Sequence, residues 1–366
     1  MVAKPRSVVV VSHAGVLATN RGVYEALAGG GTDVELVVPA RWRNEYRPGG
    51  FVADPPGALD GHLHPTRVLA VGRPQRHGYL ARTGAVLRRL GAEVLLVEEE
   101  PFSVAARQWS RAARRASVPY GVQVAETLDL DLPAPVARWR HGVLAHAAFV
   151  LARSPGAAEL ARRWGARIEP DVVPHDVADV DEVAAPTGPF TVAYVGRLVA
   201  EKGLDDLLAA VASLDDVHLL VAGAGPLEGD VRRAGALVEL LGAVDHDRVG
   251  DVYARAHVTC VPSRATRGWV EQFGRVVVES LVRGVPVVAS ATGELPWVLS
   301  VTGGGVLVAE RDPAALAAAL AALRDDPSGA RALGRAGREG VRGSFTTPVV
   351  AGALRAVLDR VRSRSR

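Results

Sequence analysis

Two carboxylates with seven residues between them, Glu271 and Glu279, have the types and spacing that could do chemistry. Gly274 and the apolar residues after it predict a loop followed by a helix, so Glu271 lies in the loop and Glu279 is carried by the helix. A carboxylate on an apolar helix is unfavourable without a partner, and the hydroxyl groups of a ligand can be that partner. The structural alternative places Glu271 on the surface and pairs Glu279 with Arg283, four residues later.

A short basic loop is the second candidate. The run that starts at Phe190 predicts a strand ending at Gly196, so Arg197 and Lys202 lie beyond its carboxyl end, where open α/β sheets bind ligands. Apart from Lys4, Lys202 is the only lysine of the chain, and every other cationic side chain is an arginine. This exception indicates a site that requires a compact ammonium group, and the alternative is a solvated glutamate–lysine pair at a helix start.

Length and composition favour an α/β protein with two domains. The chain has 366 residues, 48% of them hydrophobic, which is enough for two separate cores. Its formal charge of +3 argues against general nucleic-acid binding, although Arg111, Arg114 and Arg115 can form a local basic patch. The single cysteine, Cys260, excludes an internal disulfide and is expected in the core. The apolar run Val8–Val11 is too short for a signal segment or a membrane span, so we expect a cytoplasmic protein.

Apolar runs alternate with amphipathic segments along the chain, which predicts βαβ units and parallel sheets. In the first half, the expected strands are 7–11, 34–38, 95–97 and 118–124, with a helix at 20–28. The acidic segment 170–189, which contains four prolines, is expected to connect two domains, and the alternation restarts at Phe190 with a helix at 204–214. A last helix is expected at 349–361, before a basic end.

Several motifs of the second half resemble, in order and spacing, the nucleotide-binding half of family-4 retaining glycosyltransferases with the GT-B fold (group 1 glycosyl transferases). They are VGRLVAEKG, VAGAGPLEG and PSRATRGWVEQFGRVVVESLVRGVPVVAS. The resemblance covers residues 190–345 strongly and the first half weakly. It implies two Rossmann-like domains facing a central cleft, with the acceptor domain at 1–175, the donor domain at 176–345, and a helix at 346–366 that crosses back to the first domain.

The resemblance also implies roles for individual residues. Arg197 and Lys202 hold the donor diphosphate, and Glu279 binds the ribose hydroxyls. Glu271, with the backbone of the three residues after it, holds the sugar. The remaining donor-binding candidates are Gly196, Gly223, Val244 beside the base, and Gln272, Phe273 and Gly274. Two cations at the leaving group agree with the chemistry, since charge develops there as the sugar–diphosphate bond breaks.

The first half departs from the common family pattern, and its candidates contact the acceptor or the sugar. Its first loop has Gly15 where many members have a glycine pair, and His13 precedes it as a ligand or a structural residue. Many members place a histidine after a middle strand, where this chain has Gln123 and Glu126 instead.

Together with the resemblance, these observations predict a retaining hexosyltransferase that uses a UDP-, GDP- or dTDP-linked sugar and needs no metal or other cofactor. Its acceptor is a hydroxyl or amine of a small molecule, a lipid or a glycan. We expect no nucleic-acid partner, and at most a weak peripheral contact with the inner membrane face. Asp129 and Asp131 offer the alternative of a metal-dependent GT-A enzyme. Gly223 and Gly225 mimic a dinucleotide fingerprint that Pro226 interrupts, which leaves an oxidoreductase as a weaker alternative. A non-catalytic binder of nucleotide sugars is the third.

Overall fold

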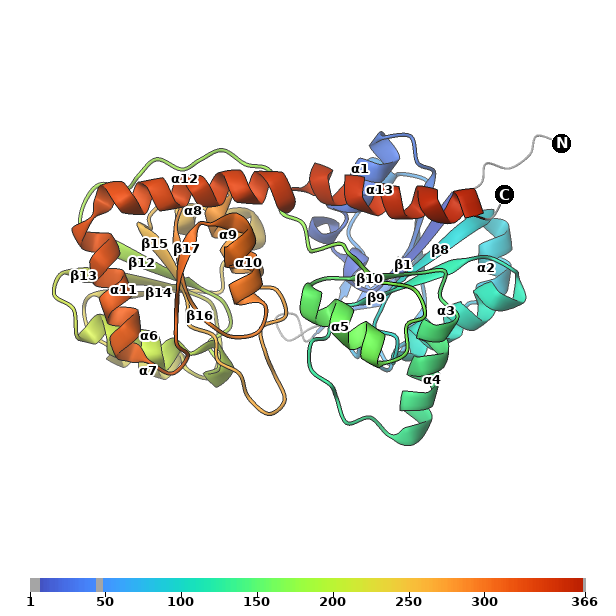
Figure 1. Cartoon of the computed structure of the whole chain (residues 1–366), viewed down its shortest axis with the longest axis horizontal. Helices are drawn as coiled ribbons and strands as arrows, with labels where there is room; N and C mark the ends of the chain where they lie inside the picture. The colour runs from blue at the N-terminus through green and yellow to red at the C-terminus, as the bar shows by residue number, and fades with distance from the viewer. Residues whose placement is uncertain (1–6, 44–48, 365–366) are drawn as a thin grey trace. The chain divides into compact units, whose positions relative to one another are not determined.

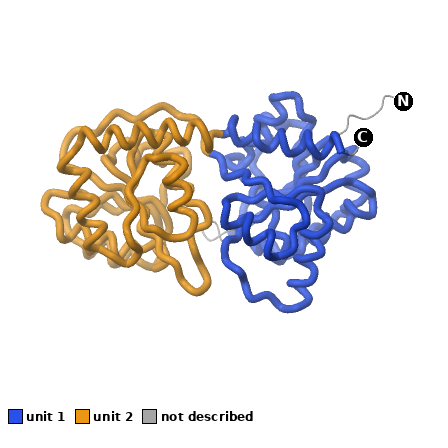
Figure 2. Tube along the Cα trace, in the orientation of Figure 1, with its two compact units in different colours: residues 1–176, 347–366 blue, residues 177–346 orange. Residues whose placement is uncertain are grey.

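The computed structural model describes residues 7–43 and 49–364, which divide into two compact units. The first unit runs to Asp176 and includes the chain again from Thr347, whereas the second unit runs from Val177 to Thr346 (Figure 2). The boundaries expected from the sequence each lie one residue earlier. Lys4 lies outside the described residues.

A sheet of seven parallel strands forms the centre of the first unit (Figure 1). In order across the sheet, the strands are β11 (Asp171–Val172), β10 (Phe149–Ala152), β9 (Tyr120–Val124), β8 (Ala92–Glu98), β1 (Ser7–Ser12), β2 (Val34–Pro39) and β5 (Leu63–Thr66). Strand β1 is buried along its whole length because both faces of the sheet are covered. Val8 points into one core and Val9 into the other, as the alternation of a strand requires.

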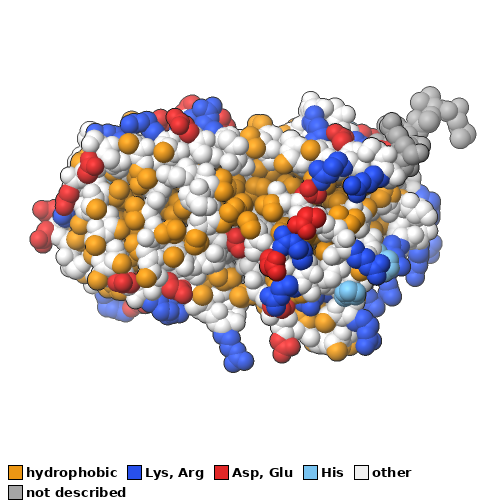
Figure 3. All heavy atoms as spheres, viewed as in Figure 1, with side chains coloured by type: hydrophobic (Ala, Val, Ile, Leu, Met, Phe, Trp, Pro, Cys, Tyr) orange, Lys and Arg blue, Asp and Glu red, His pale blue; other side chains and the backbone are white. Residues whose placement is uncertain are grey.

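Helices cover both faces of this sheet. One core contains residues of α1 (Gly22–Gly29) and α13 (Thr347–Arg364), and the other contains residues of α2 (Thr83–Arg89), α3 (Val104–Arg115), α4 (Ala134–Ala145) and α5 (Pro155–Arg163). Ser103 and Ser154 cap α3 and α5 by accepting backbone N–H groups, which explains where these helices begin. The apolar side of α13 packs on α1, and basic side chains gather over the outer side of α13 (Figure 3).

Between β2 and α2 the first unit carries an insertion of short elements. They are two antiparallel pairs, β3 (Arg41–Trp42) with β4 (Phe51–Val52) and β6 (Val68–Leu69) with β7 (Gly78–Tyr79), and the 3-10 helix η3 (Gly57–Leu59). No pattern in the sequence predicted this insertion.

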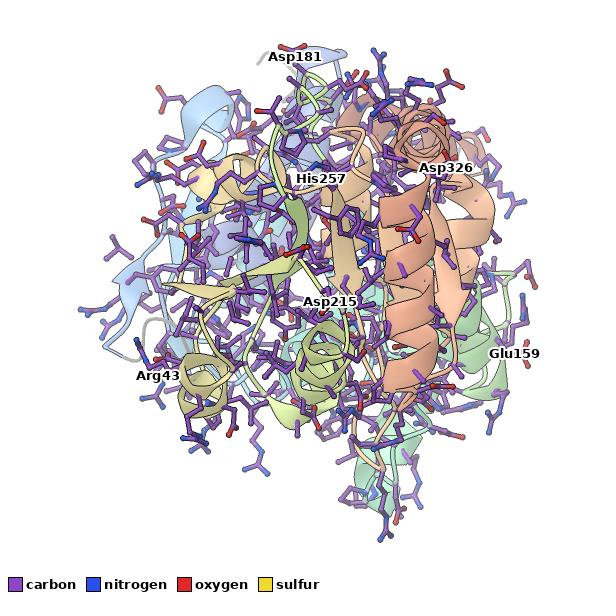
Figure 4. The ribbon with its side chains drawn as sticks, turned by 90° about the vertical axis from the view of Figure 1, so that its left-hand side faces the viewer. Arg43, Glu159, Asp181, Asp215, His257 and Asp326 are labelled. Atoms are coloured by element: carbon purple, nitrogen blue, oxygen red, sulfur yellow. The ribbon has the colours of Figure 1, made fainter. Side chains whose placement is uncertain are left out.

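The second unit contains a sheet of six parallel strands. In order they are β14 (Val238–Gly242), β13 (Val217–Ala222), β12 (Phe190–Val195), β15 (Val258–Val261), β16 (Val287–Ser290) and β17 (Gly305–Val308). Its helices are α6 (Leu204–Ala212), α7 (Glu228–Arg233), α8 (Val249–Tyr253), α9 (Arg275–Leu281), α10 (Leu295–Thr302), α11 (Pro313–Asp325) and α12 (Pro327–Ser344). Figure 4 labels His257, just before β15, and Asp326, which caps α12 by accepting the Gly329 N–H at 2.9 Å.

The two sheets share one strand order. In each, the first core strand is central, the next two follow on one side, and the fourth begins the other side, which is the 3-2-1-4-5-6 order of dinucleotide-binding folds. The order therefore reverses between β1 and β8 in the first unit and between β12 and β15 in the second. Ligands of such sheets bind beyond the carboxyl ends of the strands at this switch point.

The predicted α/β fold with two parallel sheets is confirmed, and the differences are local. Strand β9 begins at Tyr120 rather than 118, because Ser117 has a φ of +54° and turns the chain before Pro119. Two 3-10 turns, η1 (Ala14–Val16) and η2 (Ala18–Asn20), precede α1, so this helix begins at Gly22. The predicted connector 170–189 begins too early, since β11 pairs with β10 inside the first unit. Cys260 is buried, as expected. No helix of the described residues has the length and apolar character needed to cross a membrane.

Candidate active site

The switch point of the second sheet brings Lys202 and Glu271 together. Lys202 ends the 3-10 helix η4 (Ala200–Lys202) after β12, and Glu271 lies in the long loop after β15. Gly203 allows the two loops to approach, because it has a φ of +66° and a Cβ there would lie 1.9 Å from the carbonyl oxygen of Pro262. Residues 69 positions apart in the chain therefore share one site.

A short ion pair forms the centre of this site. Lys202 Nζ donates to Glu271 Oε2 at 2.6 Å, and Ser263 Oγ donates to the same oxygen at 2.9 Å. The Lys202 ammonium also lies 4.7 Å from the centroid of the Trp269 ring, within the range of a cation–π contact. The side chains of Lys202 and Glu271 are 21% and 11% exposed, so the pair is largely shielded and still open to a small ligand. This geometry contradicts the two structural alternatives, which were a Glu271 on the surface and a solvated glutamate–lysine pair at Lys202.

Arg197 lies at the same strand end. Its guanidinium is 3.5 Å from Glu201, one turn later, and its carbonyl oxygen accepts the Tyr194 hydroxyl at 2.6 Å. Gly196 directly follows β12, and Gly223 directly follows β13. A Cβ at Gly223 would lie 1.8 Å from the carbonyl oxygen of Gly196, so a side chain there would separate the two loops.

Gln272, Phe273 and Gly274 connect Glu271 to α9. Gly274 has a φ of +80° and precedes the first residue of the helix. The Phe273 side chain is 3% exposed and packs edge-on against Phe345, so it belongs to the core and only its backbone can contact a ligand. Whether these three residues hold a sugar stays a prediction.

The Glu279 carboxylate contacts Tyr253 and Arg275, and not Arg283. The Tyr253 hydroxyl donates to Glu279 Oε2 at 3.3 Å, and Arg275 Nε lies 3.8 Å from Oε1. Arg283 donates instead to the backbone carbonyl of Glu279, so the structural alternative of a Glu279–Arg283 ion pair is wrong. Burial, followed by the Glu279 charge, raises the pKa of Tyr253 well above its ordinary value, so its hydroxyl stays a donor.

Val244 follows β14 and lines a surface hollow of about 290 Å³. Leu241, Ala243 and Val252 supply apolar surface to this hollow, and its charged lining residues are Asp245, Arg248, Asp251 and Arg255. The hollow has apolar and charged lining in equal numbers of residues, and the role implied for Val244 beside a base stays a prediction.

The switch point of the first sheet holds a second pair, His13 with Glu99. His13 directly follows β1, and Glu99 directly follows β8. His13 Nδ1 lies 2.7 Å from Glu99 Oε2, and the His13 backbone N–H donates to Oε1 at 2.8 Å. The fully buried His77 approaches Glu99 Oε1 at 3.3 Å through Nε2, and the ring of Trp42 lies 5.2 Å from that of His13.

Charge interactions decide the protonation of this pair. Burial alone would lower the pKa of His13, but the Glu99 carboxylate at hydrogen-bond distance raises it above its ordinary value. Burial opposes ionisation of Glu99 as well, yet His13 and His77 hold its pKa at about 2. Because Nδ1 faces the carboxylate, His13 donates from Nδ1 and leaves Nε2 for another group.

The other first-half candidates have different surroundings. Gly15 is buried in η1, where its N–H donates to Ser12 Oγ at 3.0 Å, so it acts within its own loop. Glu126 Oε1 accepts the N–H groups of Thr127 and Leu128, both at 2.9 Å, so one of its oxygens is occupied by the adjacent backbone. Gln123 lies inside β9, and its buried Oε1 has no hydrogen-bond partner among the described residues.

Asp129 does not form the open acidic pair of a metal site. Its two carboxylate oxygens accept from Arg163 and from the indole N–H of Trp164, both at 2.7 Å. These contacts fix the loop after β9 against α5, whereas Asp131 is exposed.

Three residues of these sites were missed by sequence reasoning. Glu99 had a signal, since residues 98–100 are three consecutive glutamates at a predicted strand end. Ser263 also follows a strand, although nothing distinguished it from other serines. The contact between Tyr253 and Glu279 had no signal, because it depends on how α8 and α9 pack.

Part of the chain is similar in sequence to known glycosyltransferases. Residues 178–340 match the family model "Glycosyl transferases group 1". The chain is 35% identical over 177 residues to a glycogen synthase of Mycobacterium tuberculosis, which covers 46% of this chain and 42% of that protein. It is 39% identical over 158 residues to a D-inositol 3-phosphate glycosyltransferase of Mycolicibacterium vanbaalenii, covering 37% of this chain and 34% of the relative. The chain thus spans less than half the length of these relatives.

Solved structures are similar over nearly the whole chain. A sucrose-phosphate synthase from Thermosynechococcus elongatus has a TM-score of 0.75 at 20% identity and covers 98% of this chain and 100% of its own. The Anabaena protein HepE, solved in complex with UDP, has a TM-score of 0.74 at 17% identity and covers 97% and 100%. The GT-A alternative is therefore wrong. The chain has the GT-B fold, and its residues 178–340 are similar to the glycosyl transferases group 1 family.

Proposed function

We propose that this protein is a retaining glycosyltransferase that moves a hexose from a nucleoside diphosphate sugar to an acceptor, without a metal ion. The observation that carries the proposal is the Lys202–Glu271 pair at 2.6 Å, at the switch point of the sheet whose residues match the family. The Lys202 ammonium and the Ser263 hydroxyl both lie within hydrogen-bond distance of the Glu271 carboxylate there. Polar groups of these kinds can bind the phosphates and hydroxyls of a sugar diphosphate.

Lys202 and Arg197 stabilise the leaving group in this proposal. Both side chains are about one-quarter exposed, so they can contact a ligand in the positions that they already occupy. As the sugar–diphosphate bond breaks, charge grows on the phosphate oxygens, and preorganised cations there can supply several kcal/mol. The departing diphosphate takes the acceptor proton, so no side chain has to act as a strong base.

Glu271 and Glu279 divide the recognition of the donor. Without a donor, Glu271 accepts from Lys202 and Ser263 through one oxygen, Oε2, which leaves Oε1 for a sugar hydroxyl. Glu279 is 12% exposed and oriented by Tyr253, so its carboxylate can accept the two ribose hydroxyls as charge-assisted bonds.

The acceptor belongs to the first unit in this proposal. His13 is held by Glu99 through Nδ1, and the ring is 26% exposed, so Nε2 is placed to orient an acceptor hydroxyl. A relative from Corynebacterium glutamicum is named as a GDP-mannose-dependent mannosyltransferase, and HepE was also solved with UDP-glucose. These names support a UDP- or GDP-linked hexose as donor, and a small molecule, lipid or glycan as acceptor.

A panel of sugar nucleotides tests the proposal. The full chain is screened by thermal unfolding with UDP- and GDP-linked hexoses, and a donor at 100 times its Kd should stabilise it by about 2.7 kcal/mol. Donors that bind are then assayed for release of the nucleoside diphosphate with candidate acceptors, in excess EDTA. Binding without turnover would favour the non-catalytic alternative, and activity restored only by Mn²⁺ would refute metal independence. Stabilisation by nicotinamide dinucleotides alone would support the oxidoreductase.

A further inference from the structure

A cluster of two carboxylates and two imidazoles lies at the edge of the first sheet. Asp33 and Glu35 flank Val34 at the start of β2, and His62 and His64 flank Leu63 at the start of β5. Strands β2 and β5 are parallel neighbours, with Val37 opposite His64. Alternate residues of a strand share a face, so these four side chains gather at the amino ends of the two strands. His13, by contrast, follows the carboxyl end of β1.

The distances within the cluster match those between the ligands of a bound ion. His62 Nδ1 lies 3.6 Å from Glu35 Oε1 and 3.8 Å from Asp33 Oδ1. One ligand atom from each of these three residues lies within 4.8 Å of the other two. Two ligands of a tetrahedral zinc ion, each at about 2.1 Å from it, are about 3.4 Å apart. Shifts of a few tenths of an ångström would therefore bring two pairs to coordination geometry.

His64 contacts the other carboxylate oxygen of Glu35. Its Nε2 is hydrogen-bonded to Glu35 Oε2, the oxygen that does not face His62. Hydrogen bonds of this kind orient a ligating carboxylate. The backbone is fixed too, because the Asp33 carbonyl accepts from Val8 N–H at 2.8 Å and the His62 carbonyl accepts from Leu36 N–H at 2.9 Å. The backbone of Asp33 and of His62 is thus hydrogen-bonded to a neighbouring strand, which fixes where these side chains begin.

Among the described residues, no lysine or arginine forms an ion pair with the cluster. Within residues 7–43 and 49–364, the ion-pair partners of Asp33 and Glu35 are the imidazoles of His62 and His64, with no lysine or arginine among them. Asp33 and Glu35 both approach the His62 ring, so the two carboxylates lie close together. A divalent cation would remove their repulsion, and it could use His62 as a neutral nitrogen ligand.

We propose that Asp33, Glu35 and His62 bind one transition-metal ion of the zinc class, with His64 as the residue that orients Glu35. A mixed nitrogen and carboxylate set selects such an ion over Ca²⁺ or Mg²⁺, which prefer oxygen ligands alone. Strand β5 is the last of its sheet, so the ion fastens an edge strand to its neighbour. Its role is structural, and sugar transfer does not require it.

Zinc titration of the full chain tests the site. The protein is treated with EDTA, desalted and titrated with ZnCl₂ by calorimetry, and its thermal unfolding is followed with and without zinc. We expect one ion per chain and a rise in Tm. His62→Gln and Asp33→Asn should each weaken binding at least about 100-fold, and His64→Gln about 10- to 100-fold. His146→Gln is the matched control, because His146 is an exposed histidine of the same unit that bonds its own helix.

Two outcomes would overturn the proposal. One is wild-type protein that shows neither binding heat nor a Tm change with zinc, since the cluster would then be a set of ion pairs only. The other is unchanged affinity in His62→Gln, which would place the ion elsewhere. Loss of sugar transfer on chelation would instead contradict the metal independence of the proposed function, so the two failures are distinguishable.

Discussion

Replacing Lys202 by alanine should separate a structural role of the Lys202–Glu271 pair from a catalytic one. The change removes the donor 2.6 Å from Glu271 and leaves that carboxylate with Ser263 alone. Breaking a fully buried pair costs about 3–5 kcal/mol, but both side chains keep some contact with solvent, so we expect about 2 kcal/mol. Loss of a preorganised cation at the leaving group should also lower kcat/KM about 100-fold or more.

A double variant separates these two effects. In Lys202→Ala with Glu271→Gln no unpaired charge remains, so urea unfolding should recover most of the lost stability. Activity should not recover, because the cation is still absent. Arg232→Ala is the control, since it removes one positive charge from the same unit at a 68% exposed side chain. Lys202→Ala with kcat/KM near that of wild type would refute the reasoning, and so would a double variant whose stability and activity recover together.

Three further predictions concern other buried contacts. Glu279→Gln should weaken binding of the free nucleoside diphosphate in calorimetry and leave Tm almost unchanged, because an amide loses charge-assisted bonds to ribose; unchanged affinity would make Glu279 structural. Burial raises the pKa of Glu100 from 4.5 to about 8, so the folded chain retains a proton that the unfolded chain releases, and the free energy of unfolding falls through this group as pH rises between those values. Glu100→Gln should remove that fall in urea unfolding at pH 5 and pH 8, and equal slopes for both proteins would contradict it. Arg21, fully buried, donates to four carbonyl groups, those of Gly15, Val16, Asp54 and Pro55, so Arg21→Met should destabilise the fold by about 3 kcal/mol or more in the same assay.

The fold could be predicted because local signals and tertiary structure agree. Valine-rich runs such as the one in β1 form strands, since a parallel sheet covered on both faces buries every residue of a strand. The ends of elements were less predictable. A turn residue can decide where a strand begins. Ser117 has a positive φ, and a serine in the sequence does not indicate this conformation.

The sequence indicated where along the strands the residues of the candidate site lie, but it did not indicate which of them contact one another. Arg197 and Lys202 were expected beyond a strand end, and they lie there. That Lys202 meets Glu271, however, depends on β12 and β15 being neighbours, which follows from strand order and not from any local pattern. Whether Glu126 contacts a ligand stays a prediction. Its type and position suggested a ligand contact, yet one of its oxygens accepts two N–H groups of its own loop, a use that short-range hydrogen bonding often makes of an acidic side chain.

The shared strand order explains why both units place a charged pair at the same point. In each sheet a basic residue follows the first core strand and a glutamate follows the fourth, which gives His13 with Glu99 at 2.7 Å and Lys202 with Glu271 at 2.6 Å. The two pairs differ in chemistry. An ammonium group is a compact cation that suits a diphosphate, whereas an imidazole held through Nδ1 presents Nε2 to a hydroxyl. In the proposed function, the same topology thus provides one position for an anionic donor and another for a hydroxyl acceptor, and the basic residue after the first strand decides which.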